Sequence, residues 1–380
     1  MMGLVRVLHI VSYMGLGGLE TMLMNYYRCI DREKLQFDFL VHREDSAYYD
    51  QEIENMGGKI YRIQKQNPLN PSYINQLDKF FKEHTEYKIV HCHLDCMSSV
   101  PLKIAMKNGV PVRIAHCHSN NQDYNIKYIP KMYFKTKIKK FATKLFACSV
   151  DAGEWTFGTK NFEVFPNAID LKKYKYNVTE RELIREKLGL KNSLVIGHVG
   201  RFSPPKNHFF LIDVFFEIVK LNEHAKLMLI GSGALIEDVK KRVHDLKLDD
   251  KVLFLGTRSD VNSLLQAVDV FVLPSLYEGF GIVAIEAQAA ALPCIISDRV
   301  SSDCIKTNLV TQISVNESTE VWAREIINAA QTKRSDMYDI VKNSGLDIYE
   351  NAKMIENYYI QCEMGETDRY AFTNNIYTSV

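Results

Sequence analysis

The chain has 380 residues, of which 46% are hydrophobic and 24% charged, and its formal net charge is +1. This length exceeds what one hydrophobic core usually organises, and the near-neutral charge argues against broad nucleic-acid binding. No stretch approaches the ~18 apolar residues of a membrane span, eight cysteines are too dilute for a disulfide scaffold, and the first residues lack a signal-peptide layout. We therefore expect a protein of two domains in the reducing cytoplasm.

Apolar runs of strand length alternate along the chain with amphipathic segments of helix length. The first series of predicted strands covers 6–11, 37–40, 60–63, 89–92, 112–116, 145–148 and 164–165. After a turn-rich stretch from 166 to 177, a second series covers 195–199, 227–230, 252–255, 270–273 and 294–296. Such strands predict two parallel sheets with helices on both faces. We expect an α/β protein of two doubly wound, Rossmann-like domains, 1–170 and 171–347, with a last helical segment at about 348–380 that packs back on the first domain.

A glycine-rich turn, Gly15-Leu16-Gly17-Gly18, separates the first predicted strand from a helix expected from about Thr21. Glycines at this place let the backbone approach an anion at a helix N-terminus, so phosphate binding is one interpretation and a plain tight turn is the other. The dinucleotide fingerprint G-x-G-x-x-G is incomplete, because Glu20 stands where the last glycine belongs. This argues against a nicotinamide-dependent oxidoreductase.

Two cations follow the strand predicted at 195–199, Arg201 and Lys206, on a loop stiffened by two prolines. At the carboxyl end of a parallel strand they could clamp a diphosphate, arginine through its fork and lysine as a point charge. Solvated surface side chains are the ordinary alternative for such residues.

The segment from 269 to 293 carries two carboxylates eight residues apart, Glu278 and Glu286. The helix expected at about 280–291 is apolar nearly all round and must be buried, so Glu286 needs a polar partner. That partner is either an internal cation or the hydroxyls of a ligand such as ribose. Glu278 precedes Gly279-Phe280-Gly281 at the start of this helix, where backbone N–H groups can bind phosphate.

At this point the chain resembles glycosyltransferase family 4, whose retaining enzymes use nucleotide sugars and have the GT-B fold of two Rossmann-like domains facing each other across a cleft. The resemblance covers nearly the whole chain and is greatest to the branch that builds bacterial capsule and exopolysaccharide. The most characteristic motif of the family is a Glu-x7-Glu pair, here Glu278 and Glu286. The other matching segments are 17–20, 164–170, 200–206, 229–233 and 254–258. One departure is Ala168, where the family usually has glycine.

The resemblance also implies roles for individual residues. Glu286 binds the donor ribose and Glu278 the transferred sugar, while Arg201 and Lys206 hold the diphosphate. His116 is the expected active-site histidine, with His118 as the other candidate. Further donor contacts are expected from Gly17, Gly18, Gly256, Thr257, Arg258, Gly279, Phe280, Gly281, Ile282 and Val283.

The implied reaction moves a sugar from a nucleotide diphosphate, expected to be UDP, to a saccharide acceptor that we expect to be linked to polyprenyl diphosphate. No Asp-x-Asp motif occurs in the chain, so we expect no metal and no other cofactor. The histidines and cysteines at 91–96 and 116–118 are not expected to form a metal cluster, because the Cys-x3-Cys spacing is not that of a usual zinc site and alternate residues of a strand face opposite ways. A sugar-nucleotide epimerase and a non-catalytic sugar-binding protein are the alternatives.

Seven lysines between Lys127 and Lys144 interleave with aromatic and aliphatic residues. The pattern suits a basic amphipathic helix at an anionic lipid surface, with Pro130 in its first turn, and it suits a solvated helix face equally well. In the first case the protein contacts the inner face of the membrane peripherally and meets a lipid-linked acceptor there.

Overall fold

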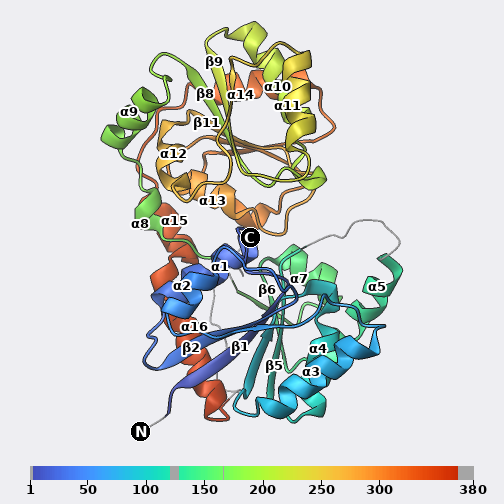
Figure 1. Cartoon of the computed structure of the whole chain (residues 1–380). Helices are drawn as coiled ribbons and strands as arrows, with labels where there is room; N and C mark the ends of the chain where they lie inside the picture. Colours follow the sequence, from blue (N-terminus) through green and yellow to red (C-terminus); the bar gives the residue numbers. More distant parts are fainter. Residues whose placement is uncertain (1–2, 120–127, 166, 367–380) are drawn as a thin grey trace. The chain divides into compact units, whose positions relative to one another are not determined.

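The computed structural model describes residues 3–119, 128–165 and 167–366 and separates into two compact units. One unit contains the chain up to Ile169 together with the segment that begins at Asp347, and the other runs from Asp170 to Leu346. Each unit is built around its own parallel sheet (Figure 1). The expected α/β class with two Rossmann-like domains is confirmed.

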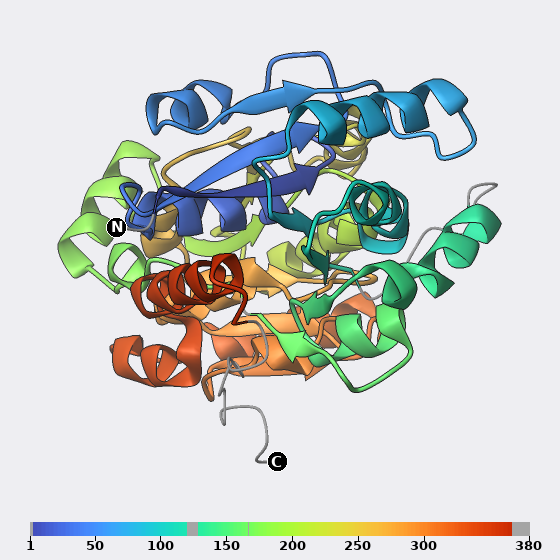
Figure 2. The ribbon, with the colours of Figure 1, turned by 90° about the horizontal axis from the view of Figure 1, so that it is seen from below.

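The first unit has a seven-stranded sheet in the order β3-β2-β1-β4-β5-β6-β7. All of its strand pairs are parallel, and Figure 2 shows the arrows of β1 and β2 side by side. The strands are β1 (Val5–Val11), β2 (Leu35–Val41), β3 (Ile60–Arg62), β4 (Ile89–Cys92), β5 (Val112–Cys117), β6 (Lys144–Ala147) and β7 (Glu163–Val164).

Helices cover this sheet and complete its core. They are α1 (Gly18–Cys29), α2 (Asp50–Asn55), α3 (Pro71–Glu83), α4 (Ser99–Lys107), α5 (Tyr128–Thr136), α6 (Ile138–Phe141), α7 (Val150–Phe157) and α16 (Ile348–Glu363). Helix α16 comes from the end of the chain, yet it packs on α1 and on the central strands. Its buried side chains, among them Ile355, Tyr358 and Tyr359, belong to the same core as Phe37 and Phe39 of β2.

The second unit has a six-stranded sheet in the order β10-β9-β8-β11-β12-β13, again parallel throughout. Its strands are β8 (Leu194–Val199), β9 (Ala225–Ile230), β10 (Val252–Phe254), β11 (Val270–Leu273), β12 (Cys294–Ser297) and β13 (Val310–Ile313). Its helices are α8 (Leu171–Tyr174), α9 (Val178–Lys187), α10 (His208–Leu221), α11 (Ile236–Asp245), α12 (Val261–Ala267), α13 (Ile282–Ala289), α14 (Thr319–Ala329) and α15 (Tyr338–Val341). The strand order reverses between β8 and β11, which is where such sheets bind ligands.

The basic segment is not one helix, which corrects the prediction. Helix α5 is followed by the short α6, and Lys144 begins β6, where the chain joins the sheet through the bond from the Thr143 N–H to the Arg113 carbonyl. Pro130 does lie in the first turn of α5, whereas Lys127 lies outside the described residues. Among the helices that the structure describes, none has the length and apolar character needed to cross a membrane.

Candidate active site

The loops that follow β8, β9 and β10 in the second unit are joined by backbone hydrogen bonds. The Gly200 N–H donates to the Ile230 carbonyl at 2.9 Å, and the Gly231 N–H donates to the Gly256 carbonyl at 2.8 Å. Gly231 has φ +141°, and a Cβ there would stand 2.1 Å from the Gly200 carbonyl oxygen. Only glycine permits this approach, so the sequence Gly231-Ser232-Gly233 serves loop packing rather than a dinucleotide fingerprint.

The two predicted diphosphate ligands lie on the loop after β8, and they differ in environment. Lys206 ends a short 3-10 turn, and Asn207 then adopts a left-handed conformation with φ +57° before α10 begins. The Lys206 ammonium forms an ion pair with the Glu278 carboxylate, and both side chains are mostly buried. Arg201 is exposed to solvent. The structure therefore brings together Lys206 and Glu278, for which the resemblance implied different parts of the donor.

Glu278 belongs to the loop between β11 and α13. Its carboxylate also accepts a hydrogen bond from the Ser275 hydroxyl at 3.4 Å, and its backbone pairs with Val300. Gly281 caps α13 with φ +78°, and a Cβ there would meet Val300 at 3.1 Å. The helix accordingly begins at Ile282, later than the predicted start near Phe280. Gly281 thus aims the first turn of α13, with its dipole and N–H groups, at the loop that carries Glu278.

Glu286 is buried in the middle of α13, with 7% of its surface exposed. Its Oε1 accepts a hydrogen bond from the Tyr174 hydroxyl at 2.8 Å, and within the described part of the chain no lysine or arginine pairs with it. Burial raises the pKa of the Glu286 carboxyl to about 7, although the Tyr174 hydrogen bond acts in the opposite direction. No described residue supplies the internal cation that the sequence left open, so this carboxylate retains capacity to accept further hydrogen bonds.

Asp269, a second carboxylate of the same unit, is paired with internal cations and can be compared with Glu286. This carboxylate is held by Arg181 and Arg185, and it also accepts the Val195 backbone N–H at 2.8 Å. Such a saturated carboxylate fixes α9 against the sheet. Glu286, which has one neutral partner, is therefore distinguished from the structural acid of its neighbourhood.

The loop after β10 holds the residues expected to meet the base. Gly256 has φ +67°, and the Thr257 hydroxyl donates to the Ser232 hydroxyl at 2.9 Å. Arg258 pairs with Asp260 at 2.6 Å and is exposed. The side chains of Thr257 and Arg258 thus bond to other groups of the second unit, so the backbone of the loop is the part that we expect to contact a ligand.

In the first unit, the glycine turn before α1 differs from its prediction. Helix α1 begins at Gly18 rather than at about Thr21, with Gly17 as its extended N-cap at φ −128°. A Cβ added at Gly18 would meet nothing within 4 Å. The fold itself therefore does not require glycine at this helix start, and the missing side chain leaves the N-terminus of α1 open.

The two candidate histidines lie at the carboxyl end of β5. His116 is 1% exposed, and neither of its ring nitrogens has a hydrogen-bond partner among the described residues. His118 follows the strand, is half-buried, and its backbone N–H donates to Asp95 Oδ1 at 2.7 Å. His118 is the more exposed of the two, but its Nδ1 is buried and its Nε2 lies 2.9 Å from His93 Nδ1, so the choice between His116 and His118 stays open.

Two residues of these sites carried no signal in the sequence. Tyr174 lies in the four-residue helix α8 that opens the second unit, more than a hundred residues before its partner Glu286. Asp95 is half-buried in the short 3-10 turn before α4, and desolvation raises the pKa of its carboxyl to about 6. Neither stands in a recognisable motif, so only the fold places them.

Comparison with known proteins agrees with this geometry. Residues 16–173 match the family model described as Glycosyltransferase Family 4, and residues 180–344 match the one described as Glycosyl transferases group 1. The solved structure of Anabaena Alr3699/HepE in complex with UDP superimposes with a TM-score of 0.76 and 19% identity, over 93% of this chain and 98% of that one. This likeness shows the GT-B fold.

Three curated relatives have informative names. Putative glycosyltransferase EpsF of Bacillus subtilis (strain 168) is 36% identical over 93% of this chain and 96% of its own length. The capsular polysaccharide biosynthesis glycosyltransferase CapH of Staphylococcus aureus is 26% identical over 89% of this chain and 96% of its own length. The UDP-Gal:alpha-D-GlcNAc-diphosphoundecaprenol alpha-1,3-galactosyltransferase of Escherichia coli is 30% identical over 59% of this chain and 61% of its own length. Since EpsF aligns along nearly the whole of both chains, this protein belongs to glycosyltransferase family 4 and is an enzyme of the GT-B fold.

Proposed function

We propose that this glycosyltransferase moves a sugar from a UDP-linked donor to a saccharide carried on polyprenyl diphosphate, in the synthesis of a capsule or exopolysaccharide. The donor is supported by the UDP bound in HepE and by the UDP-Gal named for the Escherichia coli relative. The acceptor is supported by the diphosphoundecaprenol in that same name, and the pathway by CapH. The observation that carries the proposal is the buried, cation-free Glu286 in the second unit, close in sequence to the Lys206 partner Glu278.

In this proposal the Lys206 and Glu278 pair opens when the donor binds. The donor diphosphate offers Lys206 a partner of higher negative charge, with Arg201 as the second cation, and Glu278 is released toward the hydroxyls of the transferred sugar. The ribose hydroxyls donate to Glu286 in addition to Tyr174. The backbone of Gly256 to Arg258 faces the base, and Gly18 leaves room for phosphate oxygens at the start of α1.

Catalysis on this account is electrostatic. As the glycosidic bond breaks, negative charge grows on the departing diphosphate, and Lys206, Arg201 and the first turn of α13 stabilise it. The acceptor hydroxyl attacks from the same face that the diphosphate leaves, and the leaving phosphate oxygen takes its proton, so the configuration at the sugar carbon is retained. The charge is met by side chains and helix N-termini, so the reaction needs no metal ion.

The experiment is a transfer assay with a panel of nucleotide sugars and a synthetic polyprenyl-diphosphate saccharide, with the product mass read by mass spectrometry. The expected result is acceptor extended by one sugar, with a UDP sugar as the donor. Turnover of the donor without extension of any acceptor would indicate an epimerase or a hydrolase instead.

We further propose that α5 and α6 hold the protein at the cytoplasmic face of the membrane, where such an acceptor resides. Two large apolar residues one turn apart on α5 are exposed, Ile129 by 79% and Tyr133 by 59%. Lys139 and Lys140 on α6 are also exposed, whereas Lys135 packs its ammonium 3.9 Å from the Trp155 ring. Exposed apolar and basic side chains in neighbouring elements suit an anionic bilayer surface.

Liposome co-sedimentation tests this membrane contact. Replacing Lys139 and Lys140 by glutamine together with Ile129→Ser should release the protein from anionic vesicles and leave donor affinity unchanged. The matched control replaces two exposed lysines of the second unit, Lys240 and Lys241, by glutamine and should still sediment. Equal sedimentation of the two variants would contradict the proposal.

A further inference from the structure

Five histidines of the first unit gather at the carboxyl ends of three adjacent strands. His9 of β1 stands beside His91 of β4 in the parallel register, and the register of β4 with β5 continues to place His93 beside His116. Because alternate residues of a strand share a face, His91 and His93 point to one side, as do His116 and His118. The three strands therefore direct all five imidazoles to the face that α1 and α16 cover.

The alternation of side chains along a strand was an argument against a metal cluster at these residues, but in the structure it does not separate the histidines. The alternation of side chains removes Cys92 and Cys117 from the group, since they point to the opposite face, but it collects the histidines. His9, His91 and His93 are each at most 3% exposed. Their ligand nitrogens all lie within 4.8 Å of one another, and so do those of His93, His116 and His118.

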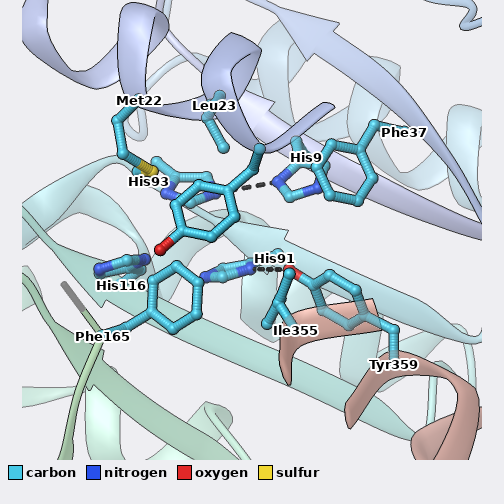
Figure 3. A pocket seen from close by; sticks show the side chains of 11 residues that line it. His9, Met22, Leu23, Phe37, His91, His93, His116, Phe165, Ile355 and Tyr359 are labelled. Atoms are coloured by element: carbon cyan, nitrogen blue, oxygen red, sulfur yellow. Dashed lines mark hydrogen bonds between the residues drawn. The ribbon is translucent and has the colours of Figure 1, made fainter. Parts of the chain in front are cut away.

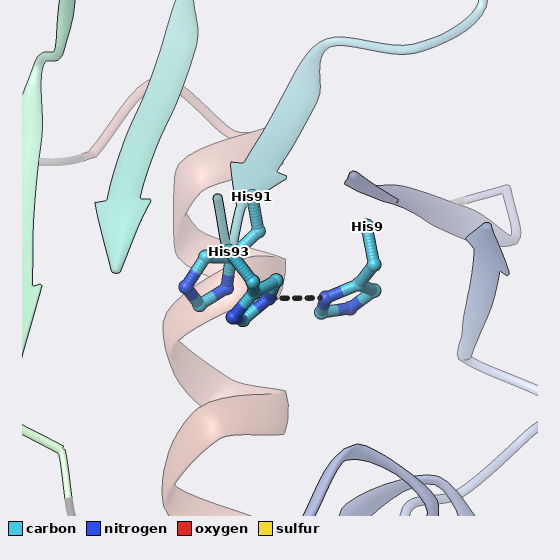
Figure 4. A group of neighbouring side chains, drawn as sticks. All are labelled: His9, His91 and His93. Carbon is cyan, nitrogen blue, oxygen red and sulfur yellow. Dashed lines mark hydrogen bonds between the residues drawn. The ribbon is translucent and has the colours of Figure 1, made fainter. Parts of the chain in front are cut away.

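Hydrogen bonds link some of these rings and leave other nitrogens bare. His9 Nδ1 lies 3.0 Å from His93 Nε2 (Figure 4), and His93 Nδ1 lies 2.9 Å from His118 Nε2. His91 Nδ1 lies 2.6 Å from the Tyr359 hydroxyl (Figure 3). His9 Nε2, His91 Nε2 and His118 Nδ1 are buried and have no partner within the described ranges.

A count of N–H donors and lone-pair acceptors shows that hydrogen bonds among His9, His93 and His118 cannot pair all of their ring nitrogens. A neutral imidazole carries one N–H and one lone pair, so His93 donates to one neighbour and accepts from the other. If His9 donates to His93 and His93 donates to His118, an unpaired lone pair is left at His9 Nε2 and an unpaired N–H at His118 Nδ1. If each ring donates in the opposite direction, the unpaired N–H is at His9 Nε2 and the unpaired lone pair is at His118 Nδ1. Either direction leaves a buried donor and a buried acceptor unpaired, which is costly unless a ligand meets them.

A small cavity adjoins these rings. It measures about 10 Å³ and is lined by His9, His91, His93 and His116 together with apolar side chains. The Met22 thioether is among the groups that line it (Figure 3). An imidazole binds a metal ion through a ring nitrogen that carries no proton.

We propose that His9, His91 and His93 bind one transition-metal ion inside the first unit. Ligand nitrogens about 2.0 Å from a tetrahedral ion stand about 3.3 Å apart. His9 Nδ1 and His93 Nε2 are 3.0 Å apart, and all three ligand nitrogens lie within 4.8 Å of one another, so the wider pairs must close when an ion binds. Metal-bound histidines usually fix their second nitrogen by a hydrogen bond, and here Tyr359 does this for His91 and His118 does it for His93. None of the three ligands is a residue proposed to bind the donor, but both candidate active-site histidines adjoin the site, since His116 lines the cavity and His118 contacts His93.

The lining also restricts the kind of ion. It contains imidazoles, a thioether and the phenols of Tyr26 and Tyr359, but no carboxylate, so it does not offer the carboxylate-rich oxygen set that Mg²⁺ and Ca²⁺ prefer. Imidazole suits Zn²⁺ and copper, and a neighbouring thioether favours Cu⁺. A single positive charge also costs less to bury among neutral groups than a double one. The ligand is thus a soft or borderline ion, with Cu⁺ and Zn²⁺ as the two probes.

The experiment starts from the whole purified protein stripped of metal with a chelator. It is given Cu⁺ under reducing conditions or Zn²⁺, desalted, and analysed for bound metal and for Tm. We expect one ion per chain for one of these probes, and at a hundredfold excess over Kd an increase in Tm of about 5 to 10 °C. Mg²⁺ should give neither effect. Less than a tenth of an equivalent of both probes in the wild-type protein would overturn the proposal.

Variants separate the buried site from surface binding. His9→Gln and His91→Gln should each weaken binding by about 100-fold or more. The matched control is His42→Gln in the same sheet, because His42 is also buried but both of its nitrogens are hydrogen-bonded, to the Val11 carbonyl at 2.8 Å and the Tyr73 hydroxyl at 2.9 Å. Retained binding in His9→Gln and His91→Gln would overturn the proposal. If these variants fail to fold, X-ray absorption of the loaded wild-type protein decides: three imidazole ligands support the site, and coordination by oxygen alone refutes it.

Discussion

Replacement of Glu286 by glutamine tests the unusual feature of the second unit, a buried carboxyl whose pKa is about 7. The ordinary value is 4.5, so the folded protein holds this proton more tightly than the unfolded chain does. The stabilising contribution is therefore fully present below pH 4.5, and it is lost as the pH rises from 4.5 to 7. The total corresponds to about 3 kcal/mol of the free energy of unfolding.

Glutamine cannot ionise, so Glu286→Gln should remove this dependence. Relative to the wild type, the variant should gain up to about 3 kcal/mol in the free energy of unfolding between pH 5 and pH 8 in the absence of donor. Urea unfolding can follow the second unit alone, because the chain has two tryptophans and Trp322 is fully buried in that unit. A Trp155→Phe background leaves Trp322 as the only reporter. The control Glu237→Gln changes an exposed carboxylate on α11 and should not alter the pH dependence.

Glu286→Gln should weaken donor binding, although it stabilises the fold at pH 8. Ribose hydroxyls bond more strongly to a carboxylate than to an amide, so Glu286→Gln should weaken the donor by about 1 to 3 kcal/mol, or about 5- to 150-fold. Calorimetry of UDP binding at pH 8 measures this change. Unaltered affinity together with an unaltered pH dependence of unfolding would refute both the buried carboxylate and its role.

Three further expectations concern the remaining site. Lys206→Ala and Arg201→Ala should each lower turnover by about 10²-fold or more, since they meet charge that develops in the transition state, and wild-type rates in a folded variant would remove the diphosphate role. Gly18→Ala should leave urea unfolding within about 1 kcal/mol of wild type, because its Cβ has open space, and should weaken UDP binding; unchanged affinity would exclude the α1 N-terminus from the site. Adding Mg²⁺ or Mn²⁺ to chelator-treated enzyme should not raise turnover, and a strict requirement for either ion would contradict electrostatic catalysis by side chains.

The strand pattern was the most predictable part of the fold. Continuous apolar runs such as Val195 to Val199 and Val270 to Leu273 are buried on both faces, and they became β8 and β11 at nearly the predicted bounds. β13 was not predicted, since Thr311 and Gln312 are exposed and its pattern is that of a half-covered edge. β13 therefore lacked the continuous hydrophobic run by which the other strands could be predicted.

Contacts distant in sequence set the limit of prediction at the site. The motif placed Glu278 and Glu286 on one segment, but it could not show that Lys206 pairs with Glu278 or that Tyr174 donates to Glu286. The helix start at Ile282 depends on the left-handed Gly281, which a count of apolar residues does not detect. The gathering of the histidines could not be predicted for the same reason, because it depends on which strands pair and in which register.

In the proposed donor site, the second unit binds the nucleotide diphosphate through Lys206 and Glu286. A crystal structure of the complex with UDP is the decisive experiment. We expect ribose hydroxyls within hydrogen-bond distance of the Glu286 carboxylate and a diphosphate oxygen beside Lys206 in place of Glu278. UDP bound away from both residues, or an intact Lys206 and Glu278 pair in the complex, would contradict it.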